Sequence, residues 1–513
     1  MRGFWQAARE DPERPALVLP DGSRKSAGEV LSACNRVVHG LRGLGCGPGA
    51  SVAVALPNGA PILEVLMAAM QAGWYFTPIN TNLAVPEVAW ILRDCGARAF
   101  VADSSLAEKA AAAADAAGLD PRGRFAVGGA PGFRAFEELS AAGPDGAPEG
   151  RQAGQLMLYT SGTTGRPRGI RRAIAPADPD RVATLYASHL MQFGIQPGPG
   201  DVHLCTSPMY HTAPLAFSYF SLHFGHRVVL MERWDAERVL QRIESEGVTT
   251  THMVPTQFHR LLLLPEGVRR RYDTSSLRRV LHAAAPCPVE LKRRMLEWWG
   301  PVIWEYYGAT EGGGTLVGPE EWLARPGTVG RAWAGAEIRV LDDDGRPCPP
   351  GQPGTVYMKL VQDFEYKGDA EKTRSARQGD FFTVGDVGYL DAEGYLFLCD
   401  RKIDMIISGG VNIYPAEVEA VLLGHPKVGD AAVFGIPDED WGEQVKAVVE
   451  AAPGVEADAT LERELRAHLE GRLARYKVPR SIDFADTLPR DPNGKLYKRV
   501  LRDPWWTGRE RKI

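Results

Sequence analysis

Apolar runs and amphipathic stretches alternate along the first 300 residues of the chain. Leu31, Cys34, Val37, Val38 and Leu41 recur at helical spacing, and residues 51–56 then read as a buried strand. Further short apolar runs lie at 99–101, 202–204, 227–230, 252–254, 280–281 and 302–304. This alternation predicts an α/β fold in which parallel-rich sheets are covered by helices. Binding sites of such sheets lie at the carboxyl ends of strands.

The pattern changes after about residue 325. Residues 330–360 are rich in turns and short strands, which predicts a small β-rich subdomain or barrel. From Arg401 onward the pattern is that of a compact α+β unit, with helices predicted at 416–423 and 461–473 and strands at 431–434 and 445–451. We therefore predict a large N-terminal domain over residues 1–400 and a small mobile C-terminal domain over residues 401–513, joined by a hinge at 399–404. Residues 107–150 are rich in Ala, Gly and Pro and predict a variable surface region.

Composition narrows the functional class. A chain of 513 residues exceeds what one core accommodates, and 44% hydrophobic with 24% charged residues is typical of soluble globular proteins. A net charge of −5 gives no electrostatic reason to expect a nucleic-acid partner. The seven cysteines form no CxxC pair, which favours a reducing cytoplasm over a disulfide framework or a zinc site. Without an apolar run of roughly 20 residues or a signal-peptide core, we expect a cytoplasmic protein with no integral membrane contact.

Residues 159–169, YTSGTTGRPRG, combine three glycines, four Ser or Thr hydroxyls and two arginines after the apolar run 155–158. Glycines let backbone N–H groups turn inward around an anion, and hydroxyls and Arg168 add donors for phosphate oxygens. An ordinary Ser/Thr/Gly surface loop is the alternative, but the density of donors favours a nucleotide phosphate. The segment is not the GxxxxGK[ST] phosphate loop, because no Lys-Ser or Lys-Thr follows its last glycine.

Six segments in order resemble the adenylate-forming superfamily of acyl-CoA synthetases, luciferases and peptide-synthetase adenylation domains. They are the loop at 159–169, SPMYHT at 207–212, EYYGATE at 305–311, TVGD at 383–386, the stretch from DRK at 400–402 to 419, and LPR at 488–490 with NGK at 493–495. The wider pattern looks most like bacterial fatty-acyl-CoA synthetases. Two departures stand out, because this family usually has Lys where the chain has Arg168, and often Asp or Lys where it has Ile403.

The resemblance implies roles for individual residues, with ATP, Mg²⁺ and CoA as cofactors. It implies catalytic roles for Lys495, Thr310, Glu311 and Arg401, with Glu311 also the magnesium ligand. It implies substrate contacts for His211, Gly312 and Gly313, where absent side chains leave room for an acyl group. It implies nucleotide or CoA contacts for Thr160, Ser161, Gly162, Thr163, Thr164, Gly165, Arg168, Ala284, Ala285, Pro286, Glu305, Tyr306, Tyr307, Gly308, Asp386, Gly409 and Gly410.

Plainer interpretations remain open for several of these residues. Thr310 and Glu311 would also suit a helix N-cap, and residues 283–286 a helix start. Asp386 could be a solvated turn aspartate, Arg401 a surface cation, and His211 a satisfied structural histidine. Lys495 alone would be an ordinary lysine in an Asn-Gly turn.

The leading hypothesis is an ATP-dependent acid–CoA ligase that forms an acyl-AMP and releases pyrophosphate, acting on a medium- or long-chain or aromatic carboxylic acid. Its partners would be the acid, ATP and CoA, and the sequence leaves a homodimer open. An alternative keeps adenylation but uses another acceptor, namely a carrier-protein thiol or an amine, or activates another small oxyanion. A nucleotide sensor with a decayed site is a third hypothesis, which the intact Lys495, Glu311 and Asp386 argue against.

Overall fold

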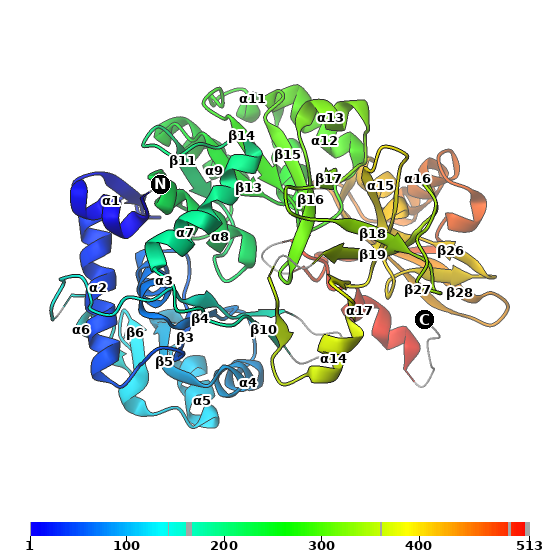
Figure 1. The fold of residues 1–513 in the computed structure, drawn as a ribbon. Helices are drawn as coiled ribbons and strands as arrows, with labels where there is room; N and C mark the ends of the chain where they lie inside the picture. Colours follow the sequence, from blue (N-terminus) through cyan, green and yellow to red (C-terminus); the bar gives the residue numbers. More distant parts are fainter. Residues whose placement is uncertain (1, 142, 161–166, 360–361, 491–493, 508–513) are drawn as a thin grey trace. The chain divides into compact units, whose positions relative to one another are not determined.

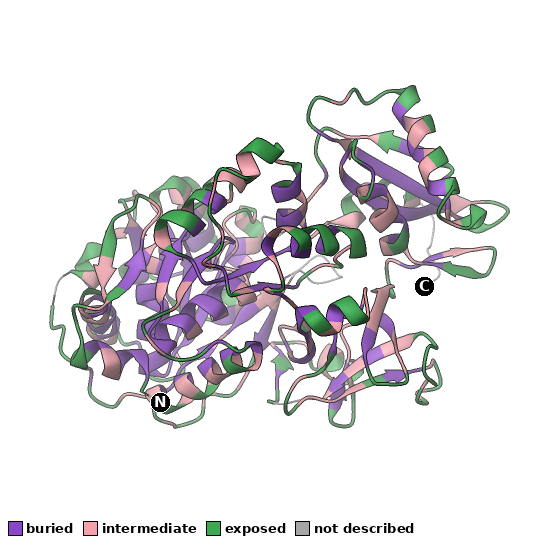
Figure 2. Cartoon of the chain, turned by 90° about the horizontal axis from the view of Figure 1, so that it is seen from above, coloured by how far each residue is buried: buried purple, intermediate pink, exposed green. Residues whose placement is uncertain are grey.

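The computed structural model describes residues 2–141, 143–160, 167–359, 362–490 and 494–507. The chain divides into two compact units (Figure 1). The first comprises residues 1–252, 272–279 and 362–375, and the second comprises residues 253–271, 280–361 and 376–513. Strands of the first unit are mostly buried, many strand residues of the second unit are partly exposed, and the outer faces of helices are exposed in both (Figure 2). The mixed α/β fold with parallel-rich sheets and a smaller C-terminal α+β part is as predicted.

A six-stranded, wholly parallel sheet forms the base of the first unit. Its spatial order is β7 (Arg134–Ala135), β6 (Arg124–Val127), β5 (Ala97–Asp103), β3 (Ser51–Ala55), β4 (Tyr75–Pro78) and β8 (Gln155–Leu156). Helices α4 (Val85–Cys95) and α5 (Ala107–Ala117) pack on β5, and α2 (Ala27–Gly43) packs on α3 (Ala60–Ala72) and α6 (Glu137–Ser140). Residues 107–150 therefore supply helices α5 and α6 and two sheet strands, so the predicted surface region also contributes to the core.

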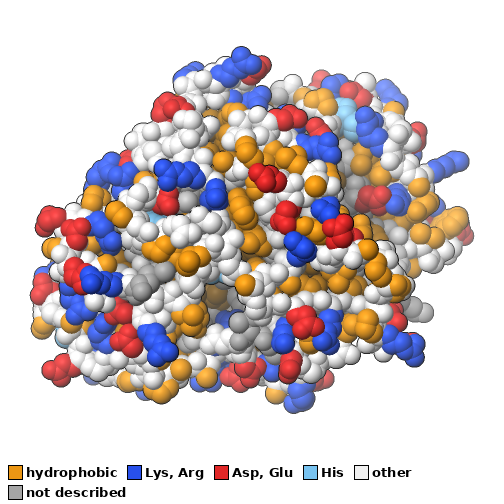
Figure 3. Space-filling model, turned by 45° about the horizontal axis from the view of Figure 1, so that its top comes forward, with side chains coloured by type: hydrophobic (Ala, Val, Ile, Leu, Met, Phe, Trp, Pro, Cys, Tyr) orange, Lys and Arg blue, Asp and Glu red, His pale blue; other side chains and the backbone are white. Residues whose placement is uncertain are grey.

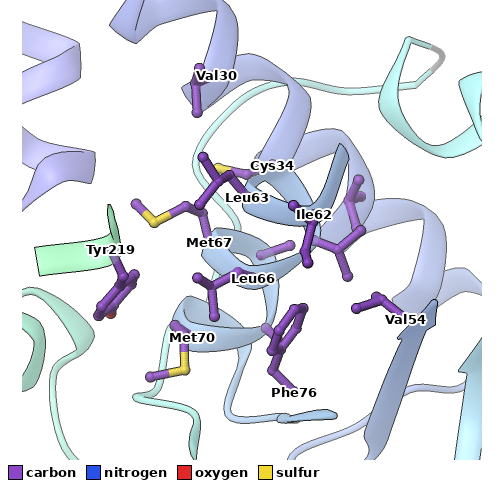
Figure 4. Packing of buried hydrophobic residues seen from close by; sticks show 14 of the residues in the cluster. Val30, Cys34, Val54, Ile62, Leu63, Leu66, Met67, Met70, Phe76 and Tyr219 are labelled. Carbon is purple, nitrogen blue, oxygen red and sulfur yellow. The ribbon is translucent and has the colours of Figure 1, made fainter. Parts of the chain in front are cut away.

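Helix α3 lies in the middle of the largest apolar cluster (Figure 4). Leu63, Leu66 and Met67 of this helix are at most 1% exposed. They pack with Cys34 of α2 and Tyr219 of α8 (Thr212–Phe224). A helix that is apolar all round can be buried on every side, and this burial makes α3 the structural centre of the first unit.

Two further sheets complete the first unit. One has the order β13 (Thr250–Met253), β11 (Val202–Cys205), β12 (Arg227–Leu230), β1 (Pro15–Val18) and β2 (Arg24–Ser26), and only the β1–β2 pair is antiparallel. This sheet is covered by α8 and α9 (Ala236–Glu246). Helices α1 (Phe4–Glu10) and α7 (Pro179–Ala187) pack on α8. The other is antiparallel, with the order β20 (Glu365–Tyr366), β10 (Arg168–Arg171) and β9 (Leu158–Thr160), next to α14 (Ala370–Ser375).

Three imidazoles lie at the core of the first unit. His203 and His252, on neighbouring strands, flank Phe217 of α8, with ring centroids 6.4 Å and 5.3 Å from it. His223 accepts a hydrogen bond from the Phe4 backbone N–H through Nδ1 at 3.0 Å, which requires a neutral ring. Burial lowers the pKa of each of these histidines to about 3.

The second unit contains the β-rich part that the sequence predicts after residue 325. Strands β14 (Arg279–His282), β15 (Ile303–Ala309), β16 (Gly312–Val317) and β17 (Arg331–Ala332) are adjacent in this order. A separate antiparallel sheet has the order β21 (Arg377–Gln378), β22 (Phe381–Phe382), β19 (Gly354–Lys359), β23 (Asp386–Leu390) and β24 (Leu396–Arg401), with β18 (Ile338–Leu341) paired to β19. The accompanying helices are α10 (Pro255–Leu263), α11 (Glu266–Arg269), α12 (Val289–Trp299) and α13 (Pro319–Ala324).

The C-terminal α+β part follows the predicted order. Its sheet has the order β26 (Val411–Ile413), β25 (Ile406–Ser408), β28 (Gly442–Ala451) and β27 (Val428–Asp438), and β29 (Ser481–Phe484) pairs with β28. Helices α15 (Pro415–Leu423) and α16 (Ala459–Glu470) share an apolar cluster with these strands, and α17 (Lys498–Arg502) packs on β27. Neither this order nor the division into units tests the predicted boundary at residue 400, which stays a prediction.

Charged side chains of both signs are interspersed over the face drawn in Figure 3, with apolar side chains between them. Within the described ranges, no helix combines the length and apolarity needed to cross a bilayer.

Candidate functional site

The predicted phosphate loop joins two antiparallel strands. Ser161, Gly162, Thr163, Thr164 and Gly165 lie outside the described residues, but Thr160 of β9 pairs with Arg168 of β10. The described residues on the two sides of the loop therefore pair as antiparallel strands. The short run 155–158 splits into β8, which joins the parallel sheet, and β9, which pairs with β10.

Helix α4 holds both sides of this strand pair. The hydroxyl of Tyr159 donates to Asp94, and the indole N–H of Trp90 donates to the carbonyl of Pro167 at 3.1 Å. Burial raises the pKa of Tyr159 well above its usual value, so the hydroxyl keeps its proton and stays a donor. These contacts fix where the chain enters and leaves the loop.

Arg168 lies at the exit of the loop and is largely buried. Its Nε lies 3.5 Å from Oδ2 of Asp369, the residue that also accepts from the backbone N–H of Lys372 at the start of α14. Next to it, the carbonyl of Gly169 accepts from the backbone N–H of Lys367 at 2.8 Å. The guanidinium thus has a carboxylate partner within the protein.

His211 immediately precedes helix α8. Its ring lies 4.7 Å from that of Tyr210, whose hydroxyl accepts from the side-chain amide of Asn82 at 3.2 Å. The backbone of His211 is extended, with φ −91° and ψ 150°, and its side chain does not cap the helix.

The turn after β14 carries the predicted adenine-binding residues. Ala284 and Pro286 are exposed and Ala285 is half-buried, and α12 begins only at Val289, so the alternative of a helix start at these positions is wrong. Ala284 has φ 75°, and it is the one non-glycine residue with positive φ in the part of the chain that the structure describes. Such a backbone conformation is uncommon for an alanine and often marks a functional turn.

Glu305 faces the core. Its Oε2 lies 2.7 Å from Nζ of Lys292 on α12 and 3.5 Å from Nε2 of His282. Lys292 is fully buried, and its ammonium also lies 4.5 Å from the centre of the Trp322 ring. The Glu305 carboxylate is therefore engaged in a buried ion pair, and the nucleotide contact of this residue stays a prediction.

Tyr307, Asp386 and Arg401 come together at one place in the second unit. The Tyr307 hydroxyl donates to Oδ2 of Asp386 at 2.7 Å, and Nε of Arg401 lies 3.5 Å from Oδ1. Pairing of β23 with β24 puts Asp386 directly opposite Arg401. The Asp386 side chain is only 14% exposed, which excludes a solvated turn aspartate. Burial, followed by the charge of Asp386, raises the pKa of Tyr307, so its hydroxyl stays protonated.

Tyr306 and Gly308 flank Tyr307 on the same strand. Burial raises the pKa of Tyr306 as well, so both rings are neutral phenols. Gly308 pairs with Gly314 of β16, and a Cβ at Gly308 would lie 3.2 Å from the Trp333 ring. Strand β15 therefore carries aromatic rings and, at Gly308, a backbone without a side chain. Both are suitable surfaces for a flat base.

Thr310 and Glu311 form the turn between β15 and β16, so the alternative of a helix N-cap is wrong. Glu311 is 7% exposed, and its charge is among the causes that raise the pKa of Tyr307. One buried carboxylate fits Mg²⁺, which takes one or two carboxylates and fills its shell with phosphate oxygens and water. Across the described ranges, no group of three or more His, Cys, Asp or Glu residues could hold a metal.

The glycine run that follows does not form one open space. A Cβ at Gly313 would lie 2.7 Å from Cβ of Met358, and one at Gly314 would lie 2.4 Å from the Trp333 ring. Only at Gly312 would an added Cβ meet nothing within 4 Å. The role of Gly312 next to an acyl group stays a prediction, and Gly313 packs against Met358.

Gly409 and Gly410 form an exposed turn between β25 and β26. Their φ values are 57° and 80°, which favour glycine. A Cβ at Gly409 would lie 2.4 Å from the Trp441 ring, and the Gly409 N–H donates to the Trp441 carbonyl at 2.8 Å. Trp441 is 52% exposed, and the sequence analysis did not single it out.

The hinge residues are tied to neighbours on both sides. Lys402 pairs with Asp343 at 2.8 Å, and Nη1 of Arg502 lies 3.3 Å from the carbonyl of Ile403 and 3.2 Å from Oδ1 of Asp404. The side chain of Ile403 is 43% exposed. Ile403 thus contacts α17 through its backbone carbonyl, and its side chain adds no charge to the hinge.

Lys495 is half-buried in a short hairpin. A β-bridge joins Arg490 to Leu496, and the N–H of Tyr497 donates to the carbonyl of Pro489 at 2.8 Å. Asn493 lies outside the described residues. Two residues that the sequence analysis did not assign form ion pairs next to this hairpin. Asp430 pairs with Arg490, and Lys498, at the start of α17, pairs with Glu419.

Two hollows of the first unit lie elsewhere. They measure about 1020 Å³ and about 530 Å³, and both are lined by Lys25 and Glu64, whose side chains form an ion pair at 2.6 Å. The residues that line these hollows include none of the predicted site residues.

Known proteins show the same overall organisation. The family model described as AMP-binding enzyme matches residues 4–362, and the model described as AMP-binding enzyme C-terminal domain matches residues 417–495. A feruloyl-CoA synthase from Amycolatopsis sp is 36% identical over 508 residues, covering 98% of both chains. A fatty acid–[acyl-carrier-protein] ligase, ScoC, from Streptomyces coeruleorubidus is 33% identical, covering 99% of this chain and 96% of that protein.

A solved structure extends the comparison to the fold. The anthranilate CoA ligase AuaEII in complex with anthranoyl-AMP superposes with a TM-score of 0.86 at 26% identity, covering 98% of this chain and 97% of that chain. Matches over most of the chain in two family models, in sequence and in fold show that this chain belongs to the AMP-binding enzyme family.

Proposed function

We propose that this protein is an ATP-dependent acid–CoA ligase that works through an acyl-AMP and releases pyrophosphate. The observation that carries the proposal is the cluster of Asp386, Tyr307 and Arg401 in a chain whose relatives include acid–CoA ligases over nearly their full length. A largely buried carboxylate with spare acceptor sites suits the two hydroxyls of a ribose, and Tyr307 and Arg401 hold it in place.

In the first half-reaction, a carboxylate oxygen of the acid attacks the α-phosphorus of ATP, and pyrophosphate leaves. Both reactants are anions, so catalysis depends on cations and donors aimed at the developing charge. We assign Lys495 to the attacking oxygen and α-phosphate, Thr310 to an α-phosphate oxygen, and residues 160–165 with Arg168 to the leaving pyrophosphate. Glu311 would hold Mg²⁺, which neutralises phosphate charge when bound. Ala284, Ala285 and Pro286 would lie against adenine together with Tyr306 and the backbone of Gly308.

In the second half-reaction, the CoA thiol attacks the acyl carbon and AMP leaves. We assign Gly409 and Gly410 to the approach of the pantetheine arm, because glycine lets another chain come close to the backbone. Trp441, packed on Gly409, would form part of that path. This step would use the C-terminal domain, residues 401–513, in a different position relative to the N-terminal domain, residues 1–400.

The acid itself is a medium- or long-chain or aromatic carboxylate in this proposal. His211, before α8, and Gly312, where no atom would contact an added Cβ, are the residues we assign to its binding. The acid, ATP and CoA are then the partners, a homodimer is compatible with the proposal, and a cytoplasmic location matches seven cysteines without a described disulfide.

A second candidate keeps the acyl-AMP but changes the acceptor. The relative ScoC is named for transfer to an acyl-carrier protein and matches 99% of this chain. Ile403, in place of a charged hinge residue, is compatible with an acceptor other than CoA, including an amine.

One experiment separates these candidates. Purified protein is given ATP, Mg²⁺ and a panel of fatty and aromatic acids, and pyrophosphate release is followed with CoA, with a carrier protein bearing phosphopantetheine, or with neither. Acid-dependent pyrophosphate release together with CoA consumption supports the ligase. Pyrophosphate release with no CoA consumption for any acid would reject CoA as the acceptor.

A further inference from the structure

The hairpin that carries Lys495 is short and leaves little room for support from a sheet ladder. Its described backbone contacts are the bridge of Arg490 to Leu496 and the bond from the Tyr497 N–H to the Pro489 carbonyl. A catalytic side chain must lie within about 0.5 Å of its productive position, which such a turn does not guarantee alone. Side chains must therefore supply the rest of the support.

Arg490 supplies that support from one side. Its Nε and Nη2 donate to the two carboxylate oxygens of Asp430, with Nη2 at 2.7 Å from Oδ1. The remaining Nη1 donates to the carbonyl of Gly494 at 2.6 Å. That carbonyl belongs to the peptide bond that leads into Lys495. One planar guanidinium thus ties the residue before Lys495 to strand β27.

The ion pair of Arg490 with Asp430 is shielded from water, which suits a contact that holds the hairpin. The side chains of Arg490 and Asp430 are only 14% and 10% exposed, so water competes little for their donors and acceptors. Asp430 lies where the register of β27 against β28 shifts, between Val428 and Asp430. Such a bulge re-aims a side chain that would otherwise follow the regular alternation of the strand.

Lys498, at the start of α17, anchors the chain that follows the hairpin. Its Nζ lies 2.9 Å from Oε1 of Glu419 on α15 and 3.9 Å from Oδ2 of Asp400. Burial alone would lower the pKa of Lys498, but these carboxylates, with Asp404, raise it overall, so the ammonium stays charged. Lys495 therefore lies between two anchors, one to β27 and one to α15 and the hinge.

We infer that Arg490 is a positioning residue for Lys495: its bidentate pair with Asp430 and its bond to the Gly494 carbonyl set the orientation of the catalytic lysine. This inference rests on the proposed function, because it requires Lys495 to act in adenylation. Lysine cannot replace Arg490, since an ammonium has no planar fork that serves a carboxylate and a carbonyl together.

The test measures both half-reactions in an Arg490→Lys variant of the full chain. We expect acid-dependent ATP–pyrophosphate exchange to fall by roughly 10- to 100-fold, the effect of a misplaced catalytic group. Acyl-CoA formation from supplied acyl-AMP should stay within about twofold. The matched control is Arg480→Lys, because Arg480 pairs with Asp438 at the other end of β27. The control variant should leave both half-reactions unchanged.

A double-mutant cycle separates positioning from mere structural support. If Arg490 acts through Lys495, the Arg490→Lys change should cause no further loss in a Lys495→Ala background. An equal loss in both backgrounds, an equal loss in both half-reactions, or exchange within twofold of the wild type would overturn the inference.

A readout independent of activity completes the test. Amide hydrogen exchange at Lys495 and Leu496 should become at least about tenfold faster in Arg490→Lys and stay unchanged in Arg480→Lys. Unchanged exchange would overturn the inference even if activity fell. Failure of the proposed function is distinguishable, because the wild type would then show no acid-dependent pyrophosphate exchange with any acid. If the wild type is active but Lys495→Ala is equally active, the role of Lys495 and the inference both fall.

Discussion

Titratable groups leave solvent in two different ways, and each unit supplies an example. His203, His223 and His252 in the first unit are buried neutral, whereas Lys292 with Glu305 in the second unit is buried as an ion pair and Lys498 with Glu419 is largely buried as one. A neutral imidazole contributes packing that depends on pH, and His223 adds one neutral hydrogen bond, from the Phe4 N–H. An ion pair fixes which two elements meet, here α12 with β15 and α17 with α15. The second unit thus uses buried charge to orient segments that carry predicted site residues.

The largest expected effect comes from breaking the deepest ion pair. Lys292→Met should lower the free energy of unfolding by about 3–5 kcal/mol, because it leaves the Glu305 carboxylate buried without its cation. Urea unfolding followed by tryptophan fluorescence measures the change. The double variant Lys292→Met with Glu305→Met should recover most of the loss, since apolar side chains of similar volume replace the pair. A single variant as stable as the wild type would show that the pair has no orienting role.

The histidines give the contrasting prediction, which concerns pH. Because their pKa of about 3 in the folded protein is below the usual 6.5, the unfolded chain binds protons first as pH falls. Their contribution to stability is therefore complete above pH 6.5 and is lost as pH falls toward 3. Each group contributes about 1.4 kcal/mol per pH unit, hence about 4 kcal/mol for the three at pH 5.5.

Urea unfolding at pH 7.5 and pH 5.5 measures this loss of stability. His223→Gln, which keeps an acceptor for the Phe4 N–H, should remove about a third of it. His39→Gln is the matched control because His39 lies near the surface, at 3.0 Å from the Gly146 carbonyl. Stability independent of pH over this range would mean that the buried imidazoles do not behave as neutral groups.

The third prediction tests whether Lys495, in the hairpin closed by the Arg490–Leu496 bridge, contributes to catalysis and not to stability. Lys495→Ala should reduce adenylation by roughly 10²–10³, the usual loss for one transition-state charge donor. The free energy of unfolding and thioester formation from supplied acyl-AMP should not change. Lys427→Ala is the control, because Lys427 forms a surface pair with Glu464. Equal loss in both half-reactions would assign Lys495 a structural role.

The smallest effect is expected at the ribose cluster. Tyr307→Phe removes one neutral hydrogen-bond donor from Asp386, which is worth about 1 kcal/mol, or roughly a fivefold rise in KM for ATP with kcat little changed. Initial rates of pyrophosphate release against ATP concentration measure it. Tyr389→Phe, whose ring stacks on Phe397 in the same sheet, is the control. An unchanged KM would remove Tyr307 from the nucleotide site.

Much of the fold follows from local patterns. Continuous apolar runs predicted β3, β11 and β12 because fully buried parallel strands lack polar positions. The core contribution of residues 107–150 was missed because small alanines, of which Ala110, Ala113 and Ala114 are buried, do not stand out as a core face. The antiparallel pairing of β9 with β10 was missed because apolar character does not reveal whether the next strand pairs in parallel or antiparallel fashion.

Site residues were predictable where a sequence motif lies on a strand. Contacts between residues far apart in the sequence were not predictable. Asp386 and Arg401 came from motifs, and strand pairing brings them together. The inward direction of Glu305 could have been read from its alternation with buried Ile303 in a strand. Lys292 shares a helical face with Met295, Leu296 and Trp299, which signals burial. The link of Arg490 to Asp430 spans 60 residues, and no local pattern carries it.

The glycine run of β16 also constrains how this protein could evolve. Gly312, Gly313 and Gly314 have φ values of 125°, 69° and 152°, which side chains rarely adopt, and two of the three also lack space for a Cβ. Every substitution there starts with a strained backbone, so mutation at these positions is a poor route to a new acid. A change of substrate would then require substitutions on elements other than β16. A saturation library at the three positions, selected for soluble protein, should return mostly glycine.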